Sequence, residues 1–258
     1  MEGLEEQIEK LYEIIKKSEQ IVFFGGAGVS TESGIPDFRS KDGLYNQHDI
    51  QFERYSPEYL LSHSCLMQEP EVFFEFYRQK MDTRTIQPNI THVFLSELEQ
   101  AGKQITIVTQ NIDGLHQKAG SQQVYEIHGT THRNYCASCG KQVAGDFIFE
   151  CVGVPKCPHC GGMIRPDVTL YEEGLPTEAV HGAVNAIRQA DCLIVAGTSL
   201  HVYPAASYVY EFRGEHRVIL NREELGIRLE PDRDLFIKGN MGEVFRRLRT
   251  LFDNFTGI

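Results

Sequence analysis

Residues 21–39 read IVFFGGAGVSTESGIPDFR, and this stretch decides the fold. Its first four residues are apolar, a run of the length of a buried strand, and the glycines after them stop the strand in a tight turn. Ahead of the run, apolar residues recur at helical spacing over residues 3–17, which predicts an amphipathic helix. A helix, a buried strand and a glycine turn are the start of an α/β unit.

Similar apolar runs and helical patterns alternate along the rest of the chain. The expected strands cover residues 105–108, 192–196, 217–220 and 235–237. The expected helices cover residues 91–101, 177–189, 205–212 and 242–252. This alternation predicts an α/β fold with a doubly wound, Rossmann-like parallel sheet that helices cover on both faces. Ligands of such sheets bind beyond the carboxyl ends of the strands.

Two stretches break the alternation and predict a smaller inserted lobe. Residues 42–84 are polar, with a helix expected over residues 71–80. Residues 135–165 are rich in Cys and Gly and too poor in apolar runs to pack a core unaided. We therefore expect one domain over residues 1–258. Its large lobe would span about 1–40, 85–133 and 166–258, and its small lobe about 41–84 and 134–165.

The overall charge excludes some classes of partner. The chain has 36 acidic and 25 basic residues, a formal net charge of -11. A general nucleic-acid binder needs a basic face, so we expect no nucleic-acid partner, whereas basic peptide segments suit an acidic surface. The N-terminus lacks the basic-then-apolar order of a secretion signal, and no stretch approaches the ~20 apolar residues that span a bilayer. We expect a cytoplasmic protein without a membrane partner.

The cysteines predict a structural zinc site in the small lobe. Cys136 and Cys139 form one CxxC pair, and Cys157 and Cys160 form a second, with seventeen residues between the pairs. Two such knuckles present four thiolates to one Zn²⁺ ion, and four protein ligands leave no open position for a substrate. The alternatives are incidental cysteines and a redox CxxC. The remaining cysteines, Cys65, Cys151 and Cys192, have no predicted role. Of these, we expect Cys192 to lie in the core.

The glycine loop by itself is a weak sign of dinucleotide binding. Glycines let a backbone approach a pyrophosphate, and amides at a helix start bind its oxygens. However, Thr31 stands where the third glycine of the fingerprint belongs, and no acidic residue clearly ends a second strand about twenty residues on. A plain tight turn explains the loop nearly as well.

Six segments taken together carry a resemblance to a known family. They are GGAGVSTESGIPDFR at 25–39, TQNID at 109–113, HG at 128–129, RPDVTLYEE at 165–173, GTS at 197–199 and LN at 220–221. In this order, and around two CxxC pairs, they resemble the sirtuins, which are NAD-dependent protein deacylases, and most of all the bacterial members. The resemblance covers residues 21–252.

The resemblance implies a chemistry that suits the residue types. In the family, NAD is cleaved at the nicotinamide–ribose bond and the acyl oxygen of the substrate lysine captures the ribose. A base then activates a ribose hydroxyl, and His128 falls on that position. Histidine suits the role because its ordinary pKa of about 6.5 leaves it largely neutral at pH 7. Asn111 would act beside it, on the ribose and an ordered water.

The family's NAD contacts fall on thirteen positions of this chain. Within them, the resemblance assigns Asp113 to the nicotinamide carboxamide and Phe38 to shielding the reaction centre. The thirteen are Ala27, Thr31, Phe38, Arg39, Gln110, Ile112, Asp113, His128, Thr198, Ser199, Asn221, Arg222 and Met241. The purely structural alternative for residues 110–113 is a polar loop that caps a helix.

The substrate would be an acyl-lysine peptide or protein that adds a strand between two segments. The resemblance places its contacts on Val168, Leu170, Tyr171, His201 and Val202. The chain departs from the family at Glu172, where many members have glycine. Members that remove acidic acyl groups carry Tyr and Arg three residues apart, whereas here Tyr77 is followed by Lys80, so we expect a preference for acetyl or other uncharged groups.

Three alternative functions stay open at this point. The same site could transfer ADP-ribose to a protein. The glycine loop alone would also allow a dehydrogenase, which leaves nicotinamide attached to the cofactor. A non-enzymatic zinc scaffold or nucleic-acid adaptor is disfavoured by the acidic balance and by the polar residues at the strand ends. None of these functions requires an oligomer.

Overall fold

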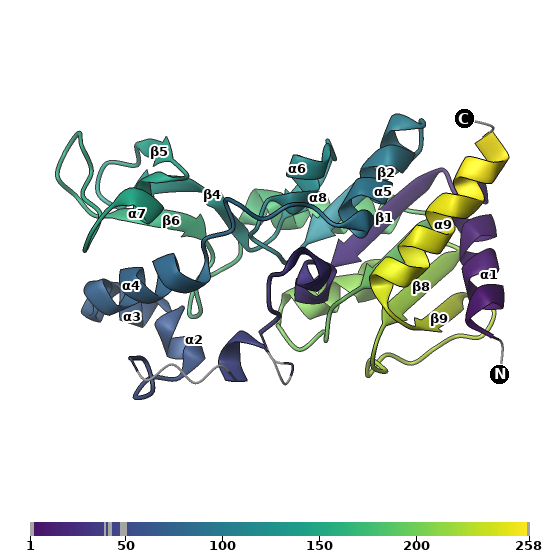
Figure 1. The fold of residues 1–258 in the computed structure, drawn as a ribbon, viewed down its shortest axis with the longest axis horizontal. Coiled ribbons are helices and arrows are strands. Elements are labelled where there is room, and N and C mark those ends of the chain that lie inside the picture. Colours follow the sequence, from purple (N-terminus) through teal and green to yellow (C-terminus); the bar gives the residue numbers. More distant parts are fainter. Residues whose placement is uncertain (1–2, 39, 41–42, 47–50, 257–258) are drawn as a thin grey trace.

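The computed structural model describes residues 3–38, 40, 43–46 and 51–256, with side chains up to residue 253. A parallel sheet of six strands forms the large lobe, in the order β3-β2-β1-β7-β8-β9 (Figure 1). The strands are β1 Gln20–Gly25, β2 Gln104–Thr109, β3 Val124–Glu126, β7 Cys192–Ala196, β8 His216–Asn221 and β9 Asp234–Lys238. All five pairings are parallel, as the alternation of strands and helices predicts.

Helices cover both faces of this sheet. One face packs against α1 Leu4–Lys17, α5 Ile90–Gln100 and α9 Met241–Thr256, and the other against α8 Thr177–Gln189 and the 3-10 helix η4 Ala205–Glu211. Strand β1 supplies both cores because successive side chains point to opposite faces. Phe23 lies in the first core and Phe24 in the second, and neither is exposed to solvent.

The predicted helices are confirmed in position, with one difference in winding. The pattern over residues 205–212 forms a 3-10 helix and not an α-helix. Its apolar residues Ala205, Ala206 and Val209 are all buried on the sheet. This short segment can cover the sheet in either winding, so the sequence pattern does not distinguish the two.

The small lobe contains a second, antiparallel sheet and a group of short helices. Its strands are β4 Gly129–Cys136, β5 Gln142–Ala144 and β6 Ile164–Val168, in the order β5-β4-β6. Its helices are η3 Leu44–Asn46, α2 Pro57–Leu60, α3 His63–Gln68, α4 Pro70–Lys80 and α7 Phe147–Glu150. These elements lie together at one end of the molecule, away from α1 and α9 (Figure 1).

One hydrophobic core joins the two inserted stretches. Phe73 and Tyr77 of α4 share it with Ile148 of α7 and Ile164 of β6, and all four are buried. The helical segment thus supplies the apolar surface that the cysteine-rich segment lacks. The exact residue boundaries of the two lobes stay a prediction.

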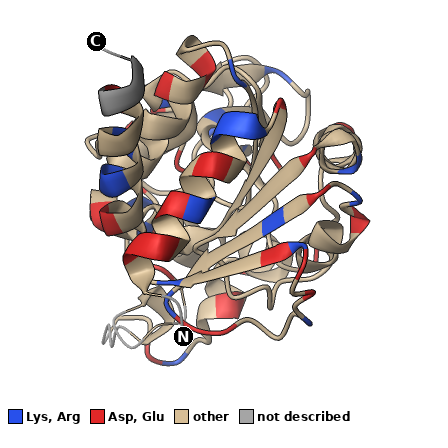
Figure 2. Cartoon of the chain, turned by 90° about the vertical axis from the view of Figure 1, so that its right-hand side faces the viewer, with Lys and Arg blue, Asp and Glu red and all other residues tan. Residues whose placement is uncertain are grey.

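The outer helices carry charges of both signs. Figure 2 shows acidic and basic residues interspersed on the helices at the α1 and α9 end. Arg247 of α9 pairs with Glu5 of α1 at 3.0 Å, and Arg249 pairs with Glu97 of α5 at 2.6 Å. Such surface pairs contribute little stability singly. Among the described helices, none is long and apolar enough to cross a membrane.

Candidate active site

Three loops meet at the carboxyl ends of β1, β2 and β7. The Gly28 amide donates to the Gly197 carbonyl at 2.8 Å, and the Gln110 amide donates to the Gly25 carbonyl at 2.9 Å. A Cβ atom on Gly28 would lie 2.8 Å from both the Cα and the carbonyl oxygen of Gly197. Only glycine fits such a backbone contact. The site therefore lies where ligands bind in parallel α/β sheets.

After β1 the chain forms two short 3-10 turns, η1 Ala27–Val29 and η2 Thr31–Ser33. Thr31 Oγ1 donates to the Gly28 carbonyl at 3.0 Å and so ties the turns together. Asn89, which the sequence analysis did not select, holds the same turns from outside. Its Nδ2 donates to the Val29 carbonyl at 2.7 Å and to Ser33 Oγ at 3.0 Å. The available sequence signal was an N-cap Asn ahead of α5.

Asp113 lies in a buried hydrogen-bond network with 6% of its surface exposed. Ser30 Oγ donates to Asp113 Oδ2 at 2.6 Å, and the Leu115 amide donates to Oδ1 at 2.9 Å. Asn111 Nδ2 donates to Ser30 Oγ at 3.0 Å. Burial raises the pKa of Asp113, and the hydrogen bond from Ser30 opposes that rise. Ser30 thus links two predicted residues, although no role was assigned to it from the sequence.

His128 is half-buried at the end of β3, and its ring orientation is fixed. Its Nδ1 lies 2.9 Å from the Gln110 carbonyl, which can only accept a hydrogen bond. Nδ1 therefore carries the proton in the neutral ring, and Nε2 is the basic nitrogen. Burial lowers the pKa of His128, and the bond to the Gln110 carbonyl opposes that effect. The ring is thus neutral at pH 7 and able to accept a proton at Nε2.

Gln110 and Thr198 connect the loops after β2 and β7. Gln110 Nε2 donates to Thr198 Oγ1 at 3.1 Å, and the Leu200 amide donates to the same oxygen at 3.1 Å. Ile112 is held by its carbonyl, which accepts from the amide and hydroxyl of Thr131. These contacts bring the predicted residues of both loops around the glycine turn.

The end of β6 reaches His128 from the small lobe. The Thr169 amide donates to the His128 carbonyl at 2.9 Å, and Val168 pairs with Gly129 in the ladder of β4 and β6. The Leu170 amide donates to the Glu173 carboxylate at 3.0 Å, and the Tyr171 amide to the Leu61 carbonyl at 3.0 Å. Three amides in a row, those of residues 169–171, therefore have partners within the protein.

The remaining predicted residues lie around the rim and make fewer contacts. Phe38 packs edge-on against Tyr45, with 5.5 Å between ring centroids. The Met241 methyl lies beside Gly197, where an added Cβ would be 2.8 Å from it. Asn221 Nδ2 donates to the Glu223 carbonyl. Ser199, His201 and Arg222 are exposed and Val202 is half-buried. Arg39 lies outside the described residues.

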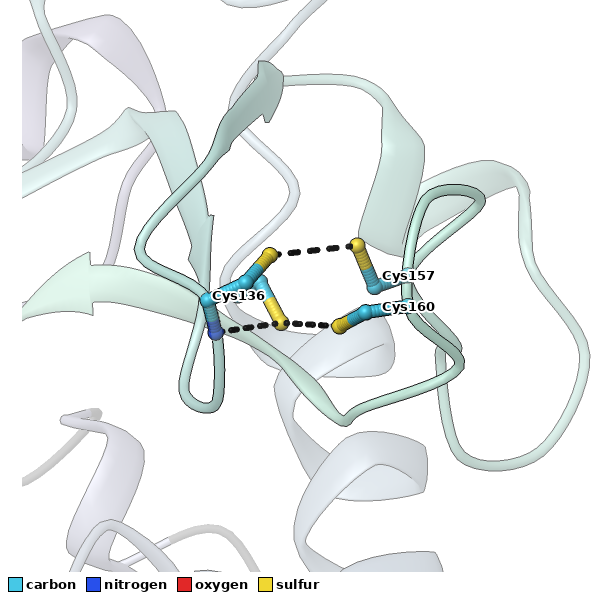
Figure 3. Close-up of side chains that lie close together, drawn as sticks. Cys136, Cys157 and Cys160 are labelled. Carbon is cyan, nitrogen blue, oxygen red and sulfur yellow. Dashed lines mark hydrogen bonds between the residues drawn. The ribbon is translucent and has the colours of Figure 1, made fainter.

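The four predicted zinc ligands come together in the small lobe, and Figure 3 shows three of them, Cys136, Cys157 and Cys160, side by side. Their sulfur atoms all lie within 4.8 Å of one another, with Cys136 and Cys160 at 3.5 Å and Cys139 and Cys157 at 3.9 Å. Zn–S bonds of about 2.3 Å in a tetrahedron require S···S distances of about 3.8 Å. The cluster therefore fits a structural Zn²⁺ ion.

The amides around this cluster support the same assignment. The Ser138 and Cys139 amides point to Cys136 Sγ at 3.4 Å, a contact that stabilises a thiolate. Gly140 and Gly161 follow the two pairs with φ of 71° and 74°, as expected for sharp turns. The other cysteines lie outside the cluster, and Cys192 is buried in the main core as predicted.

A glycine-packed loop beyond the carboxyl ends of a parallel sheet is typical of nucleotide-binding α/β proteins, and here it is joined to a lobe whose four cysteines fit a structural metal ion. Comparison with known proteins identifies its family. The Sir2 family model matches residues 26–204. The chain belongs to the Sir2 family, so the resemblance to sirtuins is confirmed.

Bacterial relatives match the chain over nearly its whole length. It is 50% identical over 247 residues to an NAD-dependent protein deacetylase of Clostridium perfringens, covering 95% of this chain and 99% of the relative. It is 52% identical over 236 residues to an NAD-dependent protein deacetylase of Cutibacterium acnes, covering 91% and 94%. The resemblance to bacterial members is thereby confirmed.

Solved structures of the family share the fold. A structure described as showing the mechanism and regulation of Sir2 enzymes superposes with a TM-score of 0.83 at 35% identity, covering 97% of this chain and 99% of the other. A Sir2 complex with a deacetylated p53 peptide and 3'-O-acetyl ADP ribose gives 0.83 at 32% identity, covering 95% and 98%. A complex of Sir2 with a p53 peptide and NAD⁺ gives 0.79 at 34% identity, covering 96% and 99%.

Proposed function

We propose that this chain is an NAD-dependent protein deacetylase that removes acetyl groups from lysine side chains. Its curated relatives carry that activity in their names, and one structural neighbour holds a deacetylated peptide with an acetylated ADP-ribose. NAD supplies the ADP-ribosyl group that takes up the acetyl group as nicotinamide leaves. One water molecule would be consumed, and the products would be nicotinamide, the free lysine and acetyl-ADP-ribose.

The neutral, oriented ring of His128 is the observation that carries the proposal. The Gln110 carbonyl accepts from Nδ1, so Nε2 is left as the acceptor. Burial lowers the pKa of His128 below its ordinary value, which keeps the ring unprotonated at pH 7. A general base needs both features: a basic atom aimed at the proton and a free lone pair at the working pH. His128 would take the proton of a ribose hydroxyl.

Asp113 and Asn111 would bind the nicotinamide side of the cofactor. The Ser30 hydroxyl fixes the positions of both side chains, since it donates to Asp113 and accepts from Asn111. The glycine loop with Ala27 and Thr31 would hold the phosphates of NAD. Thr198 and Gln110 would contact the ribose, because they lie on the neighbouring loops of the same site. Adenosine contacts by Asn221, Arg222 and Met241 remain the family's assignment.

The acetyl-lysine would enter between the end of β6 and the loop of His201 and Val202. The Val168 carbonyl, which accepts from Arg165 Nη2 at 3.2 Å, would accept the lysine amide with its second lone pair. Leu170 and Tyr171 would flank the peptide. The zinc ion would take no part in the reaction, because four cysteines fill its coordination. The cytoplasmic location stays a prediction of the cysteine pattern.

Replacement of His128 with alanine tests the proposal. The wild-type chain, incubated with NAD and an acetyl-lysine peptide, is expected to release all three products by mass spectrometry. His128→Ala should lower deacetylation by about 10²–10⁴-fold, the usual contribution of a general base. Because its pKa is lowered, the acid limb of the wild-type rate should lie below pH 6.5.

The variant should keep one zinc per chain and the wild-type circular dichroism spectrum, which separates loss of the base from loss of fold. Near wild-type turnover by His128→Ala would contradict the assignment of the base. A peptide that gains ADP-ribose and keeps its acetyl group would favour ADP-ribosyl transfer over deacetylation.

A further inference from the structure

Residues 168–173 connect the catalytic histidine to the helices of the small lobe. At one end the Thr169 amide donates to the His128 carbonyl. At the other end Tyr171 forms a parallel bridge beside α3, with its amide on the Leu61 carbonyl and its carbonyl accepting from the His63 amide, both at 3.0 Å. The segment proposed to bind the peptide is therefore held in place by its hydrogen bonds to the residues at the start of α3.

Glu172 adopts a backbone conformation that favours glycine. Its φ is 75°, in the left-handed region where a Cβ atom is strained. Glycine takes up that conformation freely because it has no Cβ atom. A glutamate retained there needs a compensating interaction, and its side chain makes one.

The Glu172 carboxylate binds the first turn of α3. Its Oε2 accepts from the Ser64 amide at 2.9 Å and from Ser64 Oγ at 2.7 Å. The first amides of a helix have no partner within the helix, so a carboxylate satisfies one of them and gains a charge-assisted bond. Unlike the backbone bridge at Tyr171, this contact depends on the side chain of one residue.

Glu173 holds the other side of the same turn. Its carboxylate accepts from Arg165 at 2.6 and 2.8 Å and lies 2.9 Å from His63 Nδ1. Glu173 thus contacts both β6, through Arg165, and the start of α3, through His63, whereas the Glu172 carboxylate contacts α3 alone.

We propose that Glu172 is a positioning residue for the acyl-lysine peptide, which locks residues 168–173 onto α3 and so sets the affinity for peptide and not for NAD. The proposal rests on the deacetylase function above. A segment that is already ordered loses less conformational entropy when a peptide strand pairs with it. The NAD loops are held by other contacts, from the Gly28 amide to the Gly197 carbonyl and from Asn89 to the Val29 carbonyl, neither of which involves Glu172.

Steady-state kinetics of Glu172→Gly and Glu172→Ala test the proposal. Each removes the carboxylate; glycine also relieves the backbone strain, while alanine keeps it. Both should raise the KM for an acetyl-lysine peptide about five-fold, the equivalent of one hydrogen bond of ~1 kcal/mol. The KM for NAD and the kcat at saturating peptide should stay within about two-fold of wild type. Ser64→Ala, which removes one of the two bonds, should give a smaller rise.

Glu178→Ala is the matched control, since it removes an exposed glutamate from the first turn of α8 and should leave all constants unchanged. An unchanged peptide KM in both Glu172 variants, or an equal rise in the KM of NAD, would overturn the positioning role. Absence of deacetylation by the wild-type chain would instead overturn the proposed function.

Discussion

Two regions of the molecule are built from loops, yet different forces hold them. One is the cofactor edge, where the loops after β1, β2 and β7 meet in the large lobe, and the other is the cysteine cluster of the small lobe. At the cofactor edge, glycine backbones touch directly above a sheet with buried cores on both faces. At the cysteine cluster, two turns face each other across four sulfur atoms, above a three-stranded sheet. The packing of the cofactor edge should therefore be disrupted by an added atom, and the cysteine cluster by the loss of a metal ligand.

Removal of one zinc ligand should have the largest effect. Cys136→Ala leaves three thiolates and exposes a half-built site, and structural zinc sites carry apparent binding energies of about 10–16 kcal/mol. We expect loss of the bound zinc by elemental analysis, together with loss of deacetylation. Cys151→Ser is the control in the same lobe, because Cys151 is outside the cluster. One zinc per chain retained by Cys136→Ala would show that the cluster is not the metal site.

Addition of one methyl group at the cofactor edge should have the next largest effect. In Gly28→Ala the new Cβ meets Gly197 backbone atoms at 2.8 Å, so the two loops must separate. Overpacking of this kind costs about 1–3 kcal/mol, measured as a drop in the free energy of unfolding in urea. NAD binding should weaken as well. Gly174→Ala, where no atom lies within 4 Å of the added Cβ, should change neither; if it matches Gly28→Ala, crowding is not the cause.

The same contrast explains which features the sequence reveals. The strands and the zinc ligands can be predicted from short patterns in the sequence. A buried strand is a short run of apolar residues, and a CxxC pair spans only four residues. The contact of Ser30 with Asp113 spans 83 positions, that of Asn89 with Val29 spans 60 and that of Glu172 with Ser64 spans 108. No local pattern encodes such pairs. The roles proposed for Asp113 and His128 came from the resemblance to sirtuins, and the structure added their hydrogen bonds.

Glu173 joins Arg165 of β6 to His63 of α3, and the effect of its replacement should be the smallest and should depend on pH. Burial alone would raise the pKa of Glu173, but hydrogen bonds from Arg165 and the Leu170 amide lower it to about 2. Because the pKa of Glu173 is lower in the folded protein than the ordinary value of 4.5, its ionised carboxylate stabilises the folded state at pH values above 4.5. This stabilisation is lost as the pH falls toward 2.

Glu173→Gln should therefore reduce the free energy of unfolding by about 1 kcal/mol at pH 7, a value discounted because the pair is partly exposed to solvent. Urea unfolding of wild type and variant at pH 7, 5, 4 and 3 should show the difference shrinking below about pH 4.5. Glu178→Gln, on the exposed first turn of α8, should show no such trend. A difference that stays constant to pH 3 would mean that Glu173 acts through packing and not through its charge.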